Sequence, residues 1–108
     1  MISLYSETTA FDLGKGVRRT LLATGGGLMT VEFRFEKGSV GALHSHPHEQ
    51  VGYVVSGRFT FTLDGKTTVL GVGDSYYVPP NAVHGVEALE DGILLDVFTP
   101  QRQDFLAT

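Results

Sequence analysis

Three of the four histidines in this 108-residue chain lie within five residues of one another, in the segment HSHPHEQ at 44–50. His44 and His46 are two positions apart, so in an extended strand both side chains leave the same face, with backbones about 6–7 Å apart. That spacing lets two imidazoles bind one metal ion at metal–nitrogen distances of about 2.0–2.1 Å. Pro47 then interrupts the strand, because it has no N–H to donate. Gln50 is expected to open the next strand, with an oxygen that can return to the same ion.

The fourth histidine, His84, follows the turn-forming segment Pro79-Pro80-Asn81, again where a strand is expected to start. The chain has no cysteine, so any metal must bind through imidazole, carboxylate or amide groups. Two alternatives stay open. The histidine run could be a solvated polar loop, or the register could slip so that Glu49 is the ligand. Parity with the first two histidines favours Gln50 over Glu49.

The amide of Gln50 bears on the chemistry of such a site. Three neutral imidazoles and one neutral amide leave the full charge of a divalent cation uncompensated. Such a centre attracts anions and polarises oxygen atoms more strongly than one with a carboxylate ligand. It also differs from the iron centres with two histidines and one carboxylate that activate oxygen. The residue set therefore favours Lewis-acid chemistry on an anionic substrate over redox chemistry.

These side chains need a rigid scaffold, and the sequence predicts one built from strands. Residues 28–35 alternate apolar and polar side chains, and the Asp64-Gly65 pair is a strong signal for a hairpin. The region 17–23 fits either a strand or a short helix, and no helical period of ten residues occurs anywhere. Many short strands between glycine-rich turns predict an all-β sandwich or barrel. The expected strands after 28–35 are 51–55, 58–63, 66–70, 75–79, 84–89 and 93–98.

Length and charge narrow the class of protein. A chain of this size suits one domain with one core. The formal net charge is −4 and no basic run is present, which excludes a phosphate-binding face and makes nucleic acid an unexpected partner. No apolar run approaches the roughly 20 residues that cross a bilayer, and the N-terminal segment lacks the pattern of a signal peptide. We therefore expect a cytoplasmic protein with no membrane partner.

The segment ILLDVF at 93–98 is apolar on both faces, with one exception. Alternation places one set of side chains on one face (Leu94, Asp96, Phe98) and a second set on the other (Ile93, Leu95, Val97). A small barrel would bury both faces only if its outer face met a second chain. We therefore expect a homodimer that uses Ile93, Leu95, Val97 and the apolar face of 28–35, with a contribution from N-terminal residues.

Asp96 is a carboxylate inside this apolar strand. Burying an unpaired charge costs several kcal/mol, so Asp96 needs a partner or a polar cavity. Arg102 is close enough in sequence to reach the same place. Two interpretations stay open: Asp96 takes part in chemistry, or an Asp96–Arg102 ion pair only anchors the C-terminal tail.

The histidine segment resembles the first motif of the cupin family. That motif is a Gly, five residues, His-x-His, three or four residues, Glu, six residues and a Gly. Gly38, His44, His46, Gln50 and Gly57 fit this spacing, with glutamine at the glutamate position.

The second cupin motif is a Gly, five residues, Pro-x-Gly, two residues, His, three residues and an Asn. Gly73, Pro79 and His84 fit it, whereas Asn81 replaces the second glycine and Ala88 replaces the asparagine. These departures fall at turn and edge positions. The resemblance implies a single-domain cupin jelly-roll β-barrel over 1–108, with a core at about 28–98 and a tail at 99–108.

Carried over position by position, the resemblance implies one divalent metal ion held by four side chains (His44, His46, Gln50 and His84). The sequence does not decide between zinc, nickel, iron and manganese.

A narrower resemblance is to the small pectin-degradation cupins of the KdgF type. It is carried by HSHPHEQVGYVVSGRFTF, GDSYYVPPNAVHGV and the ending DVFTPQRQDFL, and runs from about Leu21 to Leu106. That family linearises 4,5-unsaturated monouronates to open-chain 5-keto-4-deoxyuronate, so the resemblance implies a small anionic sugar-acid substrate. It also implies catalytic roles for Asp96, Phe98 and Arg102. The alternatives are another small metal-dependent cupin enzyme (an isomerase, cyclase or dioxygenase) and a non-enzymatic sugar-binding cupin module.

Overall fold

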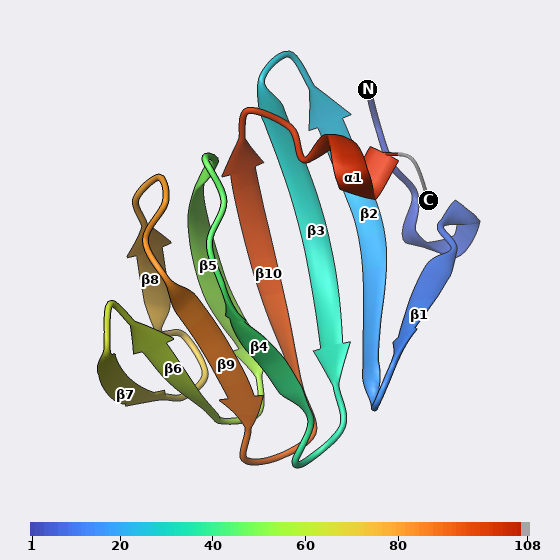
Figure 1. The fold of residues 1–108 in the computed structure, drawn as a ribbon. Helices are drawn as coiled ribbons and strands as arrows, with labels where there is room; N and C mark the ends of the chain where they lie inside the picture. Colours follow the sequence, from blue (N-terminus) through green and yellow to red (C-terminus); the bar gives the residue numbers. More distant parts are fainter. Residues whose placement is uncertain (107–108) are drawn as a thin grey trace.

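A computed structural model describes residues 1–106, which form two antiparallel sheets that face each other (Figure 1). The first sheet has six strands in the order β1 (Ala10–Gly14), β2 (Val17–Gly25), β3 (Leu28–Phe35), β10 (Gly92–Thr99), β5 (Glu49–Ser56) and β8 (Ser75–Val78). The second has four strands in the order β4 (Val40–His44), β9 (His84–Ala88), β6 (Phe59–Leu63) and β7 (Lys66–Leu70). A 3-10 turn, η1 (Tyr5–Glu7), and one helical turn, α1 (Gln103–Leu106), complete these residues.

The chain crosses from one sheet to the other after almost every strand from β3 onward. It passes from β3 to β4 in the facing sheet, back to β5, across to the β6–β7 hairpin, and then through β8 and β9 to β10. This path is that of a jelly-roll barrel and confirms the predicted all-β fold. It also places β10 in the middle of the larger sheet, between β3 and β5.

The alternation predicted for 93–98 is confirmed in β10. Leu94, Asp96 and Phe98 are buried inside the barrel, whereas Ile93 and Leu95 lie half-buried on its outer face. The corresponding prediction for 28–35 is wrong. Its apolar side chains point into the barrel, where three of them are buried (Met29, Val31 and Phe35), so this face is not available to a second chain.

Turn residues fix the registers of the strands. Asp64 and Gly65 have φ values of 49° and 81°, as a tight hairpin turn of the I′ class requires, and they join β6 to β7 as predicted. Asn81 has a φ of 68°, a left-handed conformation that asparagine tolerates better than most residues. It thus replaces glycine at that point of the second motif without loss of the turn. The ambiguous region at 17–23 is a strand, β2.

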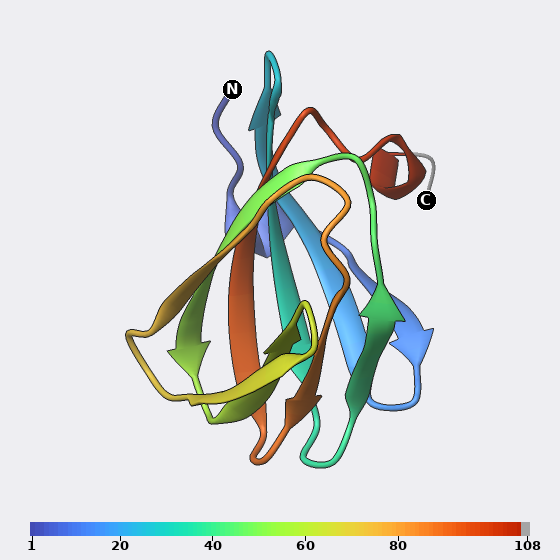
Figure 2. The same cartoon turned by 60° about the vertical axis from the view of Figure 1, so that its left-hand side comes forward.

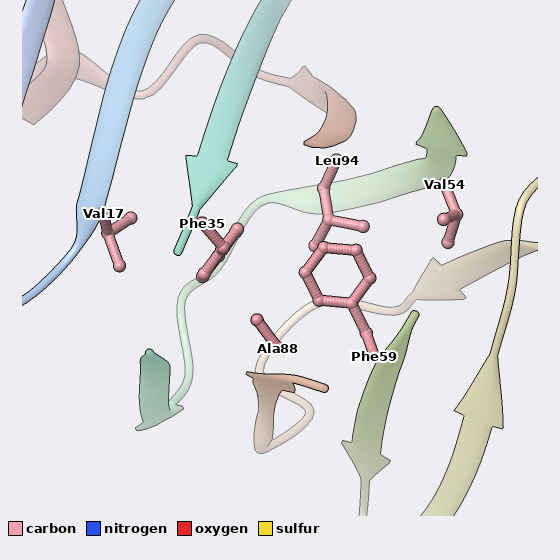
Figure 3. Close-up of a cluster of buried hydrophobic side chains, with 6 residues drawn as sticks. All are labelled: Val17, Phe35, Val54, Phe59, Ala88 and Leu94. Atoms are coloured by element: carbon pink, nitrogen blue, oxygen red, sulfur yellow. The ribbon is translucent and has the colours of Figure 1, made fainter. Parts of the chain in front are cut away.

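The apolar core closes one end of the barrel. Six buried side chains from both sheets pack there, as Figure 3 shows: Val17, Phe35, Val54, Phe59, Ala88 and Leu94. Phe35 and Phe59 meet edge to face across the two sheets, with ring centroids 5.4 Å apart.

The opposite end of the barrel is covered by loops and the C-terminal tail. The β4–β5 and β8–β9 loops arch over it, and the tail continues from β10 to α1 beside them (Figure 2). The two loops are joined by a hydrogen bond of 2.8 Å from the Asn81 N–H to the His46 carbonyl. Within residues 1–106, the helical segments are all too short to cross a membrane.

Candidate metal centre

Two strand ends and one loop bring three histidines together beneath these loops. His44 ends β4, His84 begins β9, and the two residues are directly paired in the antiparallel ladder. His46 lies in the β4–β5 loop, so it does not share a strand with His44 as the sequence suggested. The ring centroid of His46 lies 5.4 Å from that of His44 and 4.9 Å from that of His84. One ligand nitrogen from each ring lies within 4.8 Å of the others, so the three histidines can hold a metal ion.

Backbone carbonyls fix the protonation of all three rings. A carbonyl oxygen only accepts, so each Nδ1 that faces one must carry the proton, and the lone pair is then on Nε2. This leaves three Nε2 lone pairs for a cation. The contacts are His44 Nδ1 to Ala42 O at 2.8 Å, His46 Nδ1 to His48 O at 3.1 Å and His84 Nδ1 to Ala82 O at 2.9 Å.

Burial keeps two of the rings neutral. Desolvation is the largest cause that lowers the pKa of His46 to about 4, and the positive charge of Arg102 lowers it further. Desolvation also lowers the pKa of His84. Neutral imidazole is the form that binds metal, so near pH 7 both rings are ready for a cation without first losing a proton.

Two features of the cluster fit a bound cation. The Nε2 atom of His84 is buried and has no hydrogen-bond partner among the described residues, although such atoms are rarely left unsatisfied. The Nε2 atom of His46 lies 3.1 Å from Oε1 of Gln50. With Nδ1 as the donor, this contact brings two lone pairs together, and a cation between them would make both favourable. The residues present therefore fit a divalent metal ion.

The orientation predicted for Gln50 and Glu49 is confirmed. Gln50 is buried and faces the histidines, whereas the Glu49 carboxylate accepts a hydrogen bond of 2.6 Å from the hydroxyl of Tyr77, an exposed residue of β8. The strand register puts consecutive side chains on opposite faces of β5. Glu49 is thereby directed away from the cluster, which removes the alternative of a slipped register.

Asp96 lies in the interior close to this cluster and is only 4% exposed. Its Oδ1 accepts a hydrogen bond of 2.7 Å from the Tyr76 hydroxyl, and Gln50 also donates a hydrogen bond to the carboxylate. Burial is the largest influence and raises the pKa of Asp96 to about 6, against the opposing effect of these two donors. The Gln50 amide thus spans the site, with its oxygen toward His46 and its nitrogen toward Asp96.

Arg102 makes its ion pair with Asp104 rather than with Asp96. The shortest contact of that pair is 2.9 Å, and the guanidinium lies over the Phe105 ring at 4.3 Å and the Phe98 ring at 5.4 Å. Asp96 is held by Tyr76 and Gln50 instead, so the interpretation in which an Asp96–Arg102 pair anchors the tail is wrong. Phe98 is buried beside the site, with its ring 5.8 Å from that of His46.

The sequence did not point to Arg19 or Tyr76. Arg19 comes from β2, yet its guanidinium lies 4.2 Å from the centroid of the Phe105 ring, which also contacts Arg102. Burial lowers the pKa of Arg19, against the attraction of Asp104. The pair Arg18-Arg19, in a region whose sequence fits either a strand or a short helix, gives no sign of such a role, because only the docked tail brings Phe105 over Arg19.

Most of these groups line one cavity of about 330 Å³, although His46 of the histidine cluster is not among its lining residues. Its walls include His44, Gln50, His84, Asp96, Phe98, Arg102, Arg19 and Tyr76. A second hollow of about 450 Å³ adjoins the first beside the β1–β2 turn, where both are lined by Gly14, Lys15, Val17 and Phe35. Its other lining residues include charged side chains of both signs and no histidine. The chemistry-bearing residues are therefore concentrated in the first cavity, whose size suits a small molecule.

A jelly roll with a histidine cluster between its sheets is the architecture of the cupins, and this chain belongs to that family. Residues 31–98 match the cupin domain family. The pectin degradation protein KdgF of Dickeya dadantii is 40% identical over 102 residues, which is 93% of each chain.

Two solved structures are closely similar. An RmlC-like cupin from Shewanella frigidimarina NCIMB 400 is 43% identical, with a TM-score of 0.93 over 96% of this chain and 94% of that one. KdgF from a Halomonas species is 36% identical, with a TM-score of 0.92 over 97% of both chains. The resemblance proposed from the sequence is confirmed.

Proposed function

We propose that this protein is a metal-dependent enzyme that linearises 4,5-unsaturated monouronates from pectin or alginate breakdown to 5-keto-4-deoxyuronate. The observation that carries the proposal is the presence of the Asp96 carboxyl group in the same cavity as two histidines of the cluster, His44 and His84. Similarity to proteins named for pectin degradation supports the choice of substrate class.

In this proposal His44, His46, His84 and Gln50 hold the metal. When bound, a divalent ion supplies Lewis-acid stabilisation of negative charge on oxygen. Gln50 adds no negative charge, so this stabilisation is stronger than it would be with a glutamate ligand. The same cavity contains the guanidinium of Arg102, and a carboxylate of the substrate can be held there by two parallel hydrogen bonds.

The reaction needs no oxidant or reductant because it is an isomerisation. The substrate is a cyclic hemiacetal whose ring oxygen is attached to the enol carbon, C5. The anomeric hydroxyl loses its proton, and the bond between C1 and the ring oxygen breaks. Its electron pair leaves on that oxygen as an enolate, and C4 then takes up a proton. The products of these steps are the C1 aldehyde and the C5 ketone.

Asp96 is the group proposed to move the proton. It would accept the proton of the anomeric hydroxyl and return one to C4. A general acid–base group works best when its pKa lies near the working pH, and burial raises the pKa of Asp96 to about 6. Phe98, buried beside Asp96, would pack against the sugar ring and exclude water.

The test follows the loss of ultraviolet absorbance of the unsaturated bond. Monomers released by a pectin or alginate lyase are incubated with the metal-loaded protein, with the chelated protein and with buffer alone, because the monomers also open without a catalyst. We expect fast loss only with the loaded protein, and an open-chain product by NMR. Equal rates in all three samples would contradict the proposal. Consumption of a different small acid would assign the chain to another class of cupin enzyme.

A further inference from the structure

One row of paired residues crosses three strands at the wall of the cavity. Asp96 on β10 pairs with Gly52 on β5, and Gly52 pairs in turn with Tyr76 on β8. The backbones of Asp96 and Tyr76 are therefore two strand spacings apart, each about 4.8 Å. The Tyr76 hydroxyl nevertheless donates to Asp96 Oδ1 at 2.7 Å. The phenol ring must therefore lie across the inner face of β5.

Gly52 makes this crossing possible. A methyl group at Gly52 would overlap the phenol ring of Tyr76, including its hydroxyl oxygen. The backbone of Gly52 is not in the left-handed region that favours glycine, so what matters here is the missing side chain. From the facing sheet, the Phe61 ring stacks on the Tyr76 ring, with centroids 4.0 Å apart and planes 23° from parallel. The phenol is thus held between Gly52 and Phe61.

A carboxyl group needs such support to act from a fixed position. Rotation about the last bond of an aspartate is broad, with no sharply preferred angle. Hydrogen bonds from Tyr76 and Gln50 restrict that rotation in Asp96. Small errors in the placement of a catalytic group are costly, because the bound geometry must be close to the reactive one.

We propose that Tyr76 is the positioning residue for Asp96, and that its hydroxyl, carried across the side-chain-free Gly52, fixes the carboxyl group in the orientation used for proton transfer. The inference rests on the proposed function, since it gives Tyr76 a part in the same reaction. It adds two residues, Tyr76 and Gly52, that the motifs of the sequence do not assign.

The next residue provides a matched control. Tyr77 also donates to a carboxylate, Glu49 at 2.6 Å, but this pair lies on the outer face of the sheet. Tyr76→Phe and Tyr77→Phe each remove one hydroxyl from neighbouring positions of β8 and keep the aromatic ring. Only the first removes a hydrogen bond to the carboxyl group in the cavity.

The experiment is a double-mutant cycle on the metal-loaded full chain, with the unsaturated monouronate as substrate. We expect Tyr76→Phe to lower kcat about tenfold, as for the loss of one hydrogen bond to a charged group. KM and metal content should remain close to wild type, and kcat is compared per folded molecule because loss of a hydrogen bond to a buried carboxyl group also lowers the melting temperature. Tyr77→Phe should stay within about twofold of wild type in every measurement. In an Asp96→Asn background, Tyr76→Phe should change kcat by less than about twofold, because residues that act as one unit are not additive.

Three results would overturn the inference. The first is that Tyr76→Phe lowers kcat by the same factor in the Asp96→Asn background as in the wild-type background. The second is that Tyr76→Phe changes only KM. The third is that Tyr77→Phe lowers kcat as much as Tyr76→Phe does. Gly52→Ala supplies a second variant that keeps both functional groups. It should lower kcat at least as much as Tyr76→Phe does. A folded Gly52→Ala protein with the kcat of wild type would contradict the inference that the Tyr76 ring must pass over Gly52 to reach Asp96.

Inactive wild-type protein would defeat the proposed function, and an NMR measurement still tests the inference in that case. In the zinc-loaded protein, the Tyr76 hydroxyl proton should give a downfield, slowly exchanging resonance. We expect it to persist in Tyr77→Phe, to vanish in Tyr76→Phe and to shift or vanish in Asp96→Asn. If the wild-type protein shows no such resonance, Tyr76 does not hold Asp96 and the inference fails.

Discussion

The inner and outer faces of the six-stranded sheet carry the same chemical pair in different surroundings. On β8, Tyr76 donates to Asp96 at 2.7 Å on the inner face, and Tyr77 donates to Glu49 at 2.6 Å on the outer face. Asp96 is only 4% exposed, whereas Tyr77 is 50% exposed. The two hydrogen bonds therefore have nearly the same length, but the inner pair is shielded from solvent and the outer pair is exposed to it.

The surroundings decide what each pair can do. Burial raises the pKa of Asp96 to about 6, where a carboxyl group can both accept and return a proton near neutral pH. The hydrogen bond to Glu49 raises the pKa of Tyr77, which is an effect on the exposed face of the sheet. A tyrosine–carboxylate hydrogen bond alone therefore does not make a site for proton transfer. The inner pair differs from the outer pair in its interior position and in the histidines beside it.

Removing a metal-binding side chain of the inner face should have a large effect on both metal content and turnover. We expect His84→Ala to lose stoichiometric metal and to reduce turnover by more than about 100-fold, since even changes to residues that only support metal ligands cost about 10–100-fold. Elemental analysis and the uronate assay on the same sample measure both. Glu49→Gln is the outer-face control and should keep its metal and its activity. Full metal content in His84→Ala would exclude this cluster as the metal site.

A smaller loss is expected when the amide at the site becomes a carboxylate. Gln50→Glu should retain metal, with equal or higher affinity because it adds a negative charge, but should have a lower kcat because the centre is less electrophilic. It also removes the N–H donor to Asp96 and places a second carboxylate beside it. Titration with zinc and turnover at full loading measure the two effects. Unchanged or higher turnover would contradict the argument about charge.

The two faces should also differ in how stability depends on pH. In the metal-free protein the folded-state pKa of Asp96, about 6, lies above its ordinary 3.8. Its contribution to stability is therefore complete below about pH 4 and is lost as the pH rises through 6, by roughly 3 kcal/mol. The advantage of Asp96→Asn over wild type should grow over this range. The lowered pKa of His46 acts in the opposite direction, but it is common to both proteins.

Urea unfolding of the chelated proteins at several pH values between 4 and 7 measures this difference in free energy. A difference between Asp96→Asn and wild type that stays constant over this range would mean that the interior does not perturb the Asp96 carboxyl group.

The smallest effect on turnover is expected from changes to the outer face. Val51, Tyr53, Val55 and Tyr77 are exposed there, beside the half-buried side chains of β10. We still expect this face to meet a second copy of the chain, so light scattering at micromolar concentration should give the mass of two chains. Leu95→Glu should give monomers with turnover within about twofold of wild type. A monomeric wild-type protein would contradict the predicted dimer.

Much of the fold could be predicted because its signals are local. Alternation in 93–98, the Asp64-Gly65 turn and the start of a strand at His84 each depend on neighbouring residues, and all three are observed. The face of 28–35 was predicted wrongly as part of an outer interface. Alternation shows that one face is apolar, but only the sheet order shows that this face points into the barrel.

Only those residues of the site that belong to a motif of fixed spacing in the sequence could be predicted. The three histidines and Gln50 follow from motif spacing, and the structure brings them together. The argument from strand parity does not hold for His46, because β4 ends at His44. The hydrogen-bond partner of Asp96 could not be predicted from the sequence. Tyr76 reaches it across an intervening strand, and Arg102, the partner suggested by closeness in sequence, pairs with Asp104 instead. Contacts between strands distant in sequence are set by register, which no local pattern reveals.

The most direct test of the inner-face carboxyl group as the proton carrier is one purified variant, Asp96→Asn. Turnover of the unsaturated monouronate and thermal unfolding are measured on the same metal-loaded sample. Asparagine keeps the shape but cannot carry the proton, so we expect turnover to fall by about 10²–10⁴-fold. Metal content should be retained and stability should be equal or higher, because a desolvated charge is removed. A destabilised variant with near-normal turnover per folded molecule would contradict a catalytic role for Asp96.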